Sequence, residues 1–308
     1  HEGAVLRAGS IDAPILVMGP IFGAEIGLLL ENELTATVFS AEFAETLAAE
    51  AAKAGRVANV HIKIDTGMNR LGFRPSENLF REISAIRKLP QLNIQGIYSH
   101  LAASENENDD EFTKRQFETF DEFTRGLEIP IRHISNSGGV LRHPGLHLDL
   151  VRIGVLAYGL APCSTPEGAA ELAKLGIKPA LSLKSRVGHI KTVPKGESVG
   201  YGRNFYADDD MEIATIPLGY GDGIIRALSN RGKVLINGHL CPIVGNICMD
   251  QLMANASGAQ AAAGDEVVLI GEQGQRAINA ENIAIWLGSI NYEVTTAISH
   301  RVERKYKN

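Results

Sequence analysis

The pattern of apolar and polar residues changes near the middle of the chain. In the first half, short apolar runs typical of buried strands alternate with segments in which apolar residues recur at helical spacing. Strands are predicted at Ala13–Met18, Thr35–Phe39, Asn59–Ile64, Asn93–Tyr98, Arg132–Ser135 and Leu150–Ala157. Helices are predicted at Ala41–Lys53, near Glu77–Lys88 and at Asp109–Arg125. Strand–helix alternation of this kind indicates a parallel sheet with right-handed crossovers.

Two local patterns support these helices. Ser40 precedes the first of them as a capping residue and Gly55 follows it as a stop signal. Phe117, Phe120 and Phe123 lie at helical spacing in the last one, and we expect these aromatic side chains to belong to the core.

After Lys178 the pattern becomes that of a β domain. Alternating or apolar runs are separated by Gly and Asn-Gly turns. They lie at Leu181–Val193, Met211–Pro217, Lys233–Ile236, His239–Val244 and Glu266–Ile270, with one helix at Asn282–Leu287. We therefore predict two domains, residues 1–176 and residues 177–308.

The first domain is predicted to be a partial (β/α)8 barrel of the TIM type. A complete barrel takes about 250 residues and eight βα units, whereas the pattern gives six strands before the β domain. The first residues, His1 to Gly9, resemble the end of a helix. We expect the first two βα units to be absent from this chain.

Composition excludes several classes of protein. The chain has 308 residues, 44% hydrophobic and 21% charged, with a net charge of -6. An acidic chain without basic runs is not expected to bind nucleic acid, and the apolar run Ala13–Leu30 contains too many Gly, Pro and Glu residues for a membrane span. Three cysteines without paired spacing indicate a reducing compartment and no zinc or other metal site, and the acidic chain without a signal-peptide pattern fits a cytoplasmic location.

The segment from Ile62 to Phe73 has the strongest chemical signal. Lys63 and Asp65 interrupt a strand of β-branched residues, and Arg70 follows just beyond it. Active sites of parallel α/β folds lie at the carboxyl ends of strands. The planar guanidinium of an arginine there suits a carboxylate. A surface loop with a solvated arginine remains the alternative for this segment alone.

Several motifs together resemble the alanine racemase family, whose members use pyridoxal 5'-phosphate (PLP) on a fold of type III. They occur in the family's order and span nearly the whole chain. The matching segments are Lys63–Arg70, Tyr98–Leu101, His133–Ser137, Val151–Gly154, Tyr158–Leu160, Val199–Gly202, Pro217–Gly223, Gly245–Asp250 and Asn291–Val294. The resemblance implies a barrel followed by a β domain and interconversion of L- and D-alanine, through an aldimine with PLP and two bases, to supply peptidoglycan of the cell wall.

The resemblance implies which residues hold the cofactor. Ser137, the backbone amides of Gly154 and Val155, and Tyr292 match the family's phosphate contacts. Arg152 matches an arginine that faces the pyridine nitrogen and discourages its protonation. Taken singly, Ser137 could be a helix cap, Tyr292 a half-buried core residue and Arg152 part of a buried ion pair.

It also implies the substrate contacts. Arg70 and the amide of Met249 match the groups that bind the alanine carboxylate, and Lys63 matches a lysine that many members carbamylate. An unmodified Lys63 remains open. Tyr220 matches a residue of the substrate entrance, and Asp250, like Met249, matches a residue that reaches the substrate site from the β domain of the partner subunit.

Tyr201 matches the base that removes the proton from L-alanine, with His100 and Arg152 as a relay behind it. A free tyrosine has a pKa of about 10 and needs such help. His100 could instead be a structural histidine. In the family the tyrosine comes from the partner subunit, so the resemblance implies a head-to-tail homodimer.

One family feature has no match. The lysine that binds PLP as a Schiff base and acts as the second base lies in a Val-Lys-Ala-Asn/Asp-Ala-Tyr-Gly motif, which this sequence lacks. We therefore expect the chain alone to be inactive. Asn246 and Gly221 also depart from the family and leave open a serine or broader-specificity racemase. A non-catalytic PLP-binding protein is the alternative from another class.

Overall fold

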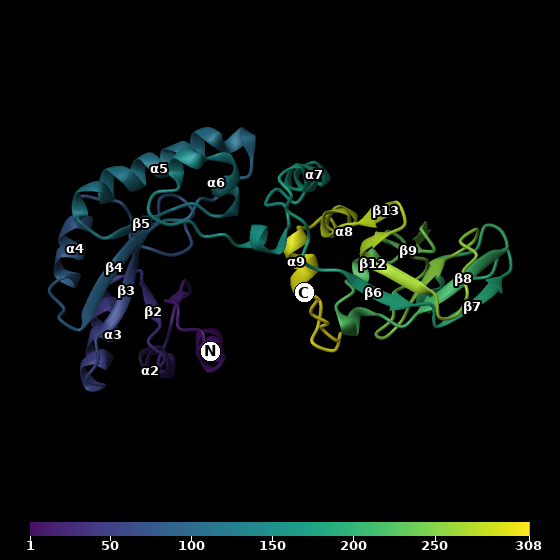
Figure 1. Cartoon of the computed structure of the whole chain (residues 1–308), viewed down its shortest axis with the longest axis horizontal. Coiled ribbons are helices and arrows are strands. Elements are labelled where there is room, and N and C mark those ends of the chain that lie inside the picture. Colours follow the sequence, from purple (N-terminus) through teal and green to yellow (C-terminus); the bar gives the residue numbers. More distant parts are fainter. Residues whose placement is uncertain (308) are drawn as a thin grey trace. The chain divides into compact units, whose positions relative to one another are not determined.

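A single parallel sheet organises the first part of the chain. The computed structural model describes residues 1–307, and it divides into two compact units, residues 1–154 and 155–308, each of which is described by itself. The sheet of the first unit has the order β1-β2-β3-β4-β5, which is also the order along the chain; Figure 1 labels its strands β2 to β5. Its strands are Leu16–Val17, Thr35–Val38, Ala58–Lys63, Leu92–Tyr98 and Ile131–His133. Every neighbouring pair is parallel, as predicted.

Helices α2 to α5 connect these strands, α1 precedes the first strand and α6 follows the last. They are α1 (Glu2–Ala8), α2 (Ala24–Glu31), α3 (Ala41–Lys53), α4 (Leu79–Ile86), α5 (Asp110–Thr124) and α6 (Ser137–Arg142). The predicted ends of α3 are confirmed, because the Ser40 hydroxyl accepts a hydrogen bond from the Phe43 amide at 3.1 Å and Gly55 has a φ of +63°. Phe120 of α5 is fully buried, and Phe117 and Phe123 pack against the same core.

The predicted sixth strand, Leu150–Ala157, is wrong. The residue before the segment, Asp149, donates from its amide to the Arg132 carbonyl of β5, and the Arg152 amide donates to the Ser135 carbonyl just after β5. The segment then turns into the 3-10 helix Val155–Tyr158 (η4). The apolar residues that suggested a strand therefore flank an irregular connection, which leaves the Arg152 side chain beside the ends of the strands.

The second unit consists mainly of antiparallel strands. One sheet has the order β10-β9-β12-β13 with β6 paired to β12, and another has the order β11-β8-β7. The strands are β6 (Leu183–Arg186), β7 (His189–Val193), β8 (Met211–Ile216), β9 (Lys233–Ile236), β10 (His239–Pro242), β11 (Leu252–Asn255), β12 (Glu266–Gln273) and β13 (Arg276–Ile278). The β domain is thus as expected, although the predicted strand 181–193 is two strands that lie in different sheets.

Three helices belong to the second unit: α7 (Pro166–Lys174), α8 (Ala280–Leu287) and α9 (Asn291–Thr296). The second unit begins at Val155, earlier than residue 177 where the sequence pattern changes, because side chains of α8 and α9 hydrogen-bond to the segment around Ala161. Among the described residues, no helix is long and apolar enough to cross a membrane.

Candidate active site

Polar side chains meet at the carboxyl ends of the parallel strands of the first unit. Lys63, the last residue of β3, pairs in register with Tyr98 at the end of β4, and Tyr98 pairs with His133 at the end of β5. The Tyr98 hydroxyl lies 2.9 Å from the hydroxyl of Thr37 on β2. The Tyr98 ring stacks on the His133 ring, with 4.7 Å between centroids. One edge of the sheet therefore gathers side chains that are distant in sequence.

Arg152 is held against this edge by several hydrogen bonds. Its Nη2 donates to the carbonyls of Ser99 at 2.7 Å and Ile134 at 2.9 Å. Nη2 also lies 3.4 Å from Nδ1 of His100, and Nη1 lies 2.5 Å from Nδ1 of His133. Burial lowers the pKa of Arg152 to about 10, so the guanidinium is still charged at neutral pH.

One nitrogen of the Arg152 guanidinium makes no hydrogen bond to the described residues. This nitrogen is Nε, which is buried. Within residues 1–307, no carboxylate forms an ion pair with Arg152 either. A buried donor without an acceptor costs about 1–3 kcal/mol. The arrangement therefore favours an acceptor supplied by a bound molecule.

Two histidines that the sequence analysis did not single out fix this arginine. Nδ1 of His61 lies 2.8 Å from Nε2 of His133. Because arginine can only donate, Nδ1 of His133 must accept from Arg152, and its proton lies on Nε2 facing His61. Burial, and then the charge of Arg152, lower the pKa of His133 to about 2 and that of His61 to about 4. Both rings are neutral at neutral pH.

A sequence signal for His61 does exist. It lies two residues before Lys63 on a strand, so both side chains point to the same face. A histidine and a lysine on one face of an otherwise apolar strand indicate a polar site at that face.

Gly96 of β4 makes room for His61. A Cβ atom on Gly96 would lie 2.5 Å from Cε1 and 2.6 Å from Nδ1 of the His61 ring. We expect Gly96→Ala to lower the free energy of unfolding in urea by about 1–3 kcal/mol, because the buried ring has no space to move. Gly126→Ala is the control, since nothing lies within 4 Å of its Cβ position. Equal stability of the two variants would contradict this packing.

Lys63 is a buried amine beside this cluster. Lys63 is only 5% exposed, and its Nζ donates to the Ile64 carbonyl at 3.1 Å. Burial and the charge of Arg152 lower its pKa from 10.5 to about 7, although Asp65 partly opposes the shift. A substantial fraction of Lys63 is therefore an unprotonated amine near neutral pH.

This pKa predicts a pH-dependent stability. Between pH 7 and pH 10.5 the unfolded chain binds more protons at Lys63 than the folded chain, so stability falls as the pH is lowered through this range and stays low below it. We expect Lys63→Met to raise the free energy of unfolding at neutral pH by about 1–3 kcal/mol and to flatten its pH dependence.

The measurement is urea unfolding in carbonate-free buffers across this range. Lys53→Met is the matched control, because Lys53 is an exposed lysine of α3. If Lys63→Met and Lys53→Met changed the stability equally at every pH, the buried amine would not be the cause.

The loop after β3 carries Arg70. It turns back on the strand, where the Asp65 carboxylate accepts hydrogen bonds from the amides of Gly67 and Asn69, both at 3.0 Å. Gly72 has a φ of +125°, and a Cβ there would lie 2.8 Å from the Lys63 carbonyl. Arg70 itself is exposed, and no hydrogen bond or ion pair is recorded for its side chain within residues 1–307.

Ser137 and Gly154 form a small polar site in the same unit. Ser137 is the first residue of α6 and is buried. The Gly154 amide donates to the Ser137 hydroxyl at 2.9 Å. A hydroxyl next to a backbone amide suits an anionic oxygen. Both lie close in sequence to residues of the Arg152 cluster.

The predicted residues of the second unit fall into two groups. Tyr201, Tyr220, Met249 and Asp250 line one hollow of about 670 Å³. The loops around it are joined by backbone bonds from Tyr220 N to Cys248 O at 3.0 Å and from Gly221 N to Met249 O at 2.8 Å. Tyr201 is 75% exposed and Met249 52% exposed. These side chains therefore lie on an accessible face of the unit.

The other group consists of Val155 and Tyr292, which were predicted to bind the cofactor phosphate. Val155 begins η4 and is buried, whereas Tyr292 lies in α9 and is partly exposed.

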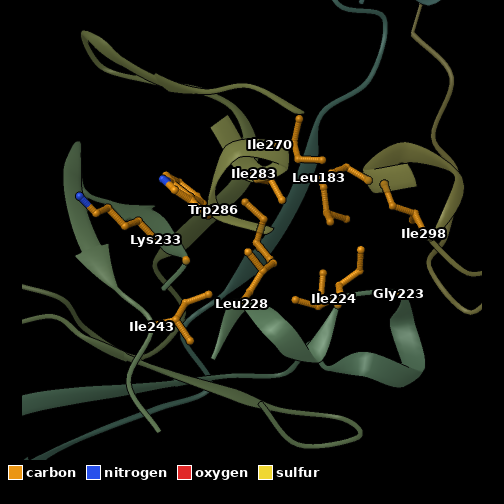
Figure 2. A pocket seen from close by; sticks show the side chains of 14 residues that line it. Leu183, Gly223, Ile224, Leu228, Lys233, Ile243, Ile270, Ile283, Trp286 and Ile298 are labelled. Carbon is orange, nitrogen blue, oxygen red and sulfur yellow. The ribbon is translucent and has the colours of Figure 1, made fainter. Parts of the chain in front are cut away.

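Another cavity in the second unit is apolar. Figure 2 shows side chains such as Leu228, Ile243 and Ile283 around it, with the Lys233 amine turned away from them. Its volume is about 30 Å³, far below the several hundred Å³ of a cofactor site. None of the predicted site residues lines it.

Comparison with known proteins gives a consistent result. Residues 1–162 match the family model "Alanine racemase, N-terminal domain", and residues 180–306 match "Alanine racemase, C-terminal domain". The chain is 42% identical to an alanine racemase of Clostridium novyi, over 99% of this chain and 79% of that protein. It is similar to the structure of an alanine racemase from Clostridium difficile (TM-score 0.89, 37% identity, 98% of this chain and 78% of that one).

A second solved structure is similar along the whole chain. It is the alanine racemase from a D-cycloserine-producing Streptomyces lavendulae, with a TM-score of 0.92 and 32% identity, covering 100% of this chain and 81% of that one.

Proposed function

The chain belongs to the alanine racemase family, and from this premise we propose that it interconverts L- and D-alanine and so supplies D-alanine for peptidoglycan. The family depends on PLP. The observation that carries the proposal is Arg152, a buried cation whose Nη atoms are bound by the protein and whose Nε is left without an acceptor. This donor fits the ring nitrogen of PLP.

Arg152 would hold that nitrogen unprotonated. When bound, PLP supplies an electron sink for the pair left as the Cα–H bond of alanine breaks. A permanent cation disfavours a second positive charge beside it. His133 and His61 are neutral and fix the guanidinium. The proton of neutral His133 lies on Nε2 and faces His61, and its Nδ1 accepts from Arg152, so on this side of the site the histidines position Arg152.

The cofactor phosphate would be bound by hydroxyl groups and backbone amides that donate hydrogen bonds to its oxygens. We propose Ser137, the amides of Gly154 and Val155, and Tyr292 as these donors. The bond between the Gly154 amide and the Ser137 hydroxyl supports the first two, because it shows that these donors are adjacent.

We propose that Arg70 and the Met249 amide bind the alanine carboxylate. The exposed guanidinium of Arg70 is available for a bidentate contact. Lys63, with its pKa lowered to about 7, would supply a neutral amine whose nitrogen adds to carbon dioxide and loses a proton to solvent, and the resulting carbamate anion would orient Arg70. Tyr220 and Asp250 line the same hollow as Met249 and are proposed to limit the size of the substrate side chain.

Tyr201 is proposed as the base for L-alanine. His100 would assist it. Burial and the charge of Arg152 lower the pKa of His100 to about 3, so the ring is neutral. Since its Nδ1 faces the Arg152 donor, its proton lies on Nε2, from which it could donate to a tyrosinate oxygen. The exposure of Tyr201 is consistent with a head-to-tail dimer in which each subunit completes its partner's site.

The second base is not assigned. The family's Schiff-base lysine has no match in the 308 residues, and we propose that these residues alone do not racemise alanine. The absence of two βα units stays a prediction, as do the domain limits at residue 176 and the cytoplasmic location. A nucleic-acid or membrane partner is no part of the proposal.

The experiment is complementation. The 308 residues are joined to the lysine-bearing first barrel strand of a relative and loaded with PLP, and formation of D-alanine from L-alanine is followed by chiral chromatography. We call this protein the complemented enzyme. We expect it to racemise alanine and the unjoined chain not to do so.

Faster turnover of serine or of larger amino acids would show a broader racemase. Binding of PLP without turnover of any amino acid, in the complemented enzyme, would favour a non-catalytic binder and contradict the proposal.

A further inference from the structure

Two buried polar side chains join distant segments of the second unit. Glu281 of α8 is 1% exposed and Asn291, the first residue of α9, is 0% exposed. The side-chain Nδ2 of Asn291 donates to Glu281 Oε1 at 2.7 Å and to the Ala161 carbonyl at 2.9 Å. Glu281 Oε1 also accepts from the Ala161 amide at 3.1 Å. The Ser164 hydroxyl donates to Asn291 Oδ1 at 2.9 Å.

One oxygen of this network is left without a partner within residues 1–307. Glu281 Oε2 is buried without a hydrogen-bond partner among the described residues, and a lone buried oxygen of this kind is unfavourable by about 1–3 kcal/mol. What the polar groups add is a fixed geometry between the segments they join.

Those segments carry two proposed phosphate donors. The segment that contains Ala161 and Ser164 begins at Val155, whose amide is one donor. Asn291 is followed directly by Tyr292, whose hydroxyl is another. About 130 residues separate Asn291 from its partner Ala161, so chain connectivity alone does not fix the spacing.

We propose that Glu281 and Asn291 are positioning residues that set the spacing between the Val155 amide and Tyr292 for a phosphate monoester. The inference rests on the proposed function, because it assumes a cofactor phosphate at these donors. Donors that are already in place avoid an ordering cost when the anion binds.

The test compares two ligands that differ only in the phosphate. Pyridoxine 5'-phosphate and pyridoxine lack the aldehyde of PLP and do not react with lysines. Their affinities for the chain are measured by calorimetry. Glu281→Leu and Ser164→Ala are expected to weaken binding of pyridoxine 5'-phosphate by about tenfold and to leave binding of pyridoxine unchanged. Glu281→Gln should retain the affinity, because its amide oxygen can accept the same two bonds.

Asn282→Ala is the matched control. Asn282 lies in the same helix and accepts from the Asn279 amide, and the structure records no hydrogen bond from its side chain to the 155–164 segment. Thermal melting confirms that each variant is folded. If Glu281→Leu and Ser164→Ala kept the wild-type affinity for pyridoxine 5'-phosphate, or lost affinity for both ligands equally, the positioning role would be overturned and the proposed function would stand. A wild-type chain with no preference for the phosphorylated ligand would instead overturn the proposed cofactor site.

Discussion

Replacing Arg152 with methionine is expected to reduce racemisation by the complemented enzyme by about 10²–10³-fold, as the loss of one preorganised donor does elsewhere. The variant removes the Arg152 Nε, a buried donor that lacks an acceptor among residues 1–307. It also leaves the Ser99 and Ile134 carbonyls without this donor, so we expect a loss of stability of about 1–3 kcal/mol. Activity and urea unfolding are measured on the same preparation.

Arg132→Met separates the two effects. Arg132 is also a partly buried arginine, and it binds Asp121 at 2.7 Å and Thr124. It makes no contact with the Arg152 cluster among the hydrogen bonds recorded. We expect this variant to lose stability and to keep its turnover and cofactor affinity. If Arg152→Met lost no more activity than Arg132→Met, Arg152 would be a structural residue only.

The second large effect is expected for Tyr201→Phe. Loss of a general base lowers turnover by about 10²–10⁴-fold. Because Tyr201 is 75% exposed, its hydroxyl contributes little to folding, and the melting temperature should not change. The expected result is a nearly inactive protein of normal stability, in contrast to Arg152→Met.

The direction of the reaction gives a sharper readout. In deuterated water, Tyr201→Phe should slow exchange of the α proton of L-alanine more than that of D-alanine. Tyr206→Phe is the control, because Tyr206 is also exposed but does not line the hollow that contains Tyr201. Equal slowing of exchange for both enantiomers would rule out a role for Tyr201 on one face.

Periodicity was sufficient to predict the parallel strands and the β domain, since it reports which face of an element is buried. It failed at Leu150–Ala157, where Val151 and Ile153 resemble a strand. Only the packing of the Arg152 guanidinium against the ends of β4 and β5 shows why the segment is irregular. The pairing of strands in the second unit could not be predicted from periodicity either, because strands that are adjacent in sequence, such as β6 and β7, belong to different sheets.

The site was predicted from motifs, and its electrostatics were not. No pattern in the sequence tells that His133 and His61 form a neutral pair behind Arg152, because the pair depends on the register between β3, β4 and β5. The space for His61 depends on Gly96 in the neighbouring strand. The role of Asn291 is similar, since its partners lie in a segment about 130 residues away.

The most direct measurement is a crystal structure of the protein with pyridoxine 5'-phosphate. We expect Arg152 Nε to donate to the ring nitrogen at about 2.7–3.2 Å, with the phosphate on Ser137. A ring bound elsewhere, or a ring nitrogen that faces a carboxylate while Nε stays without an acceptor, would contradict the account.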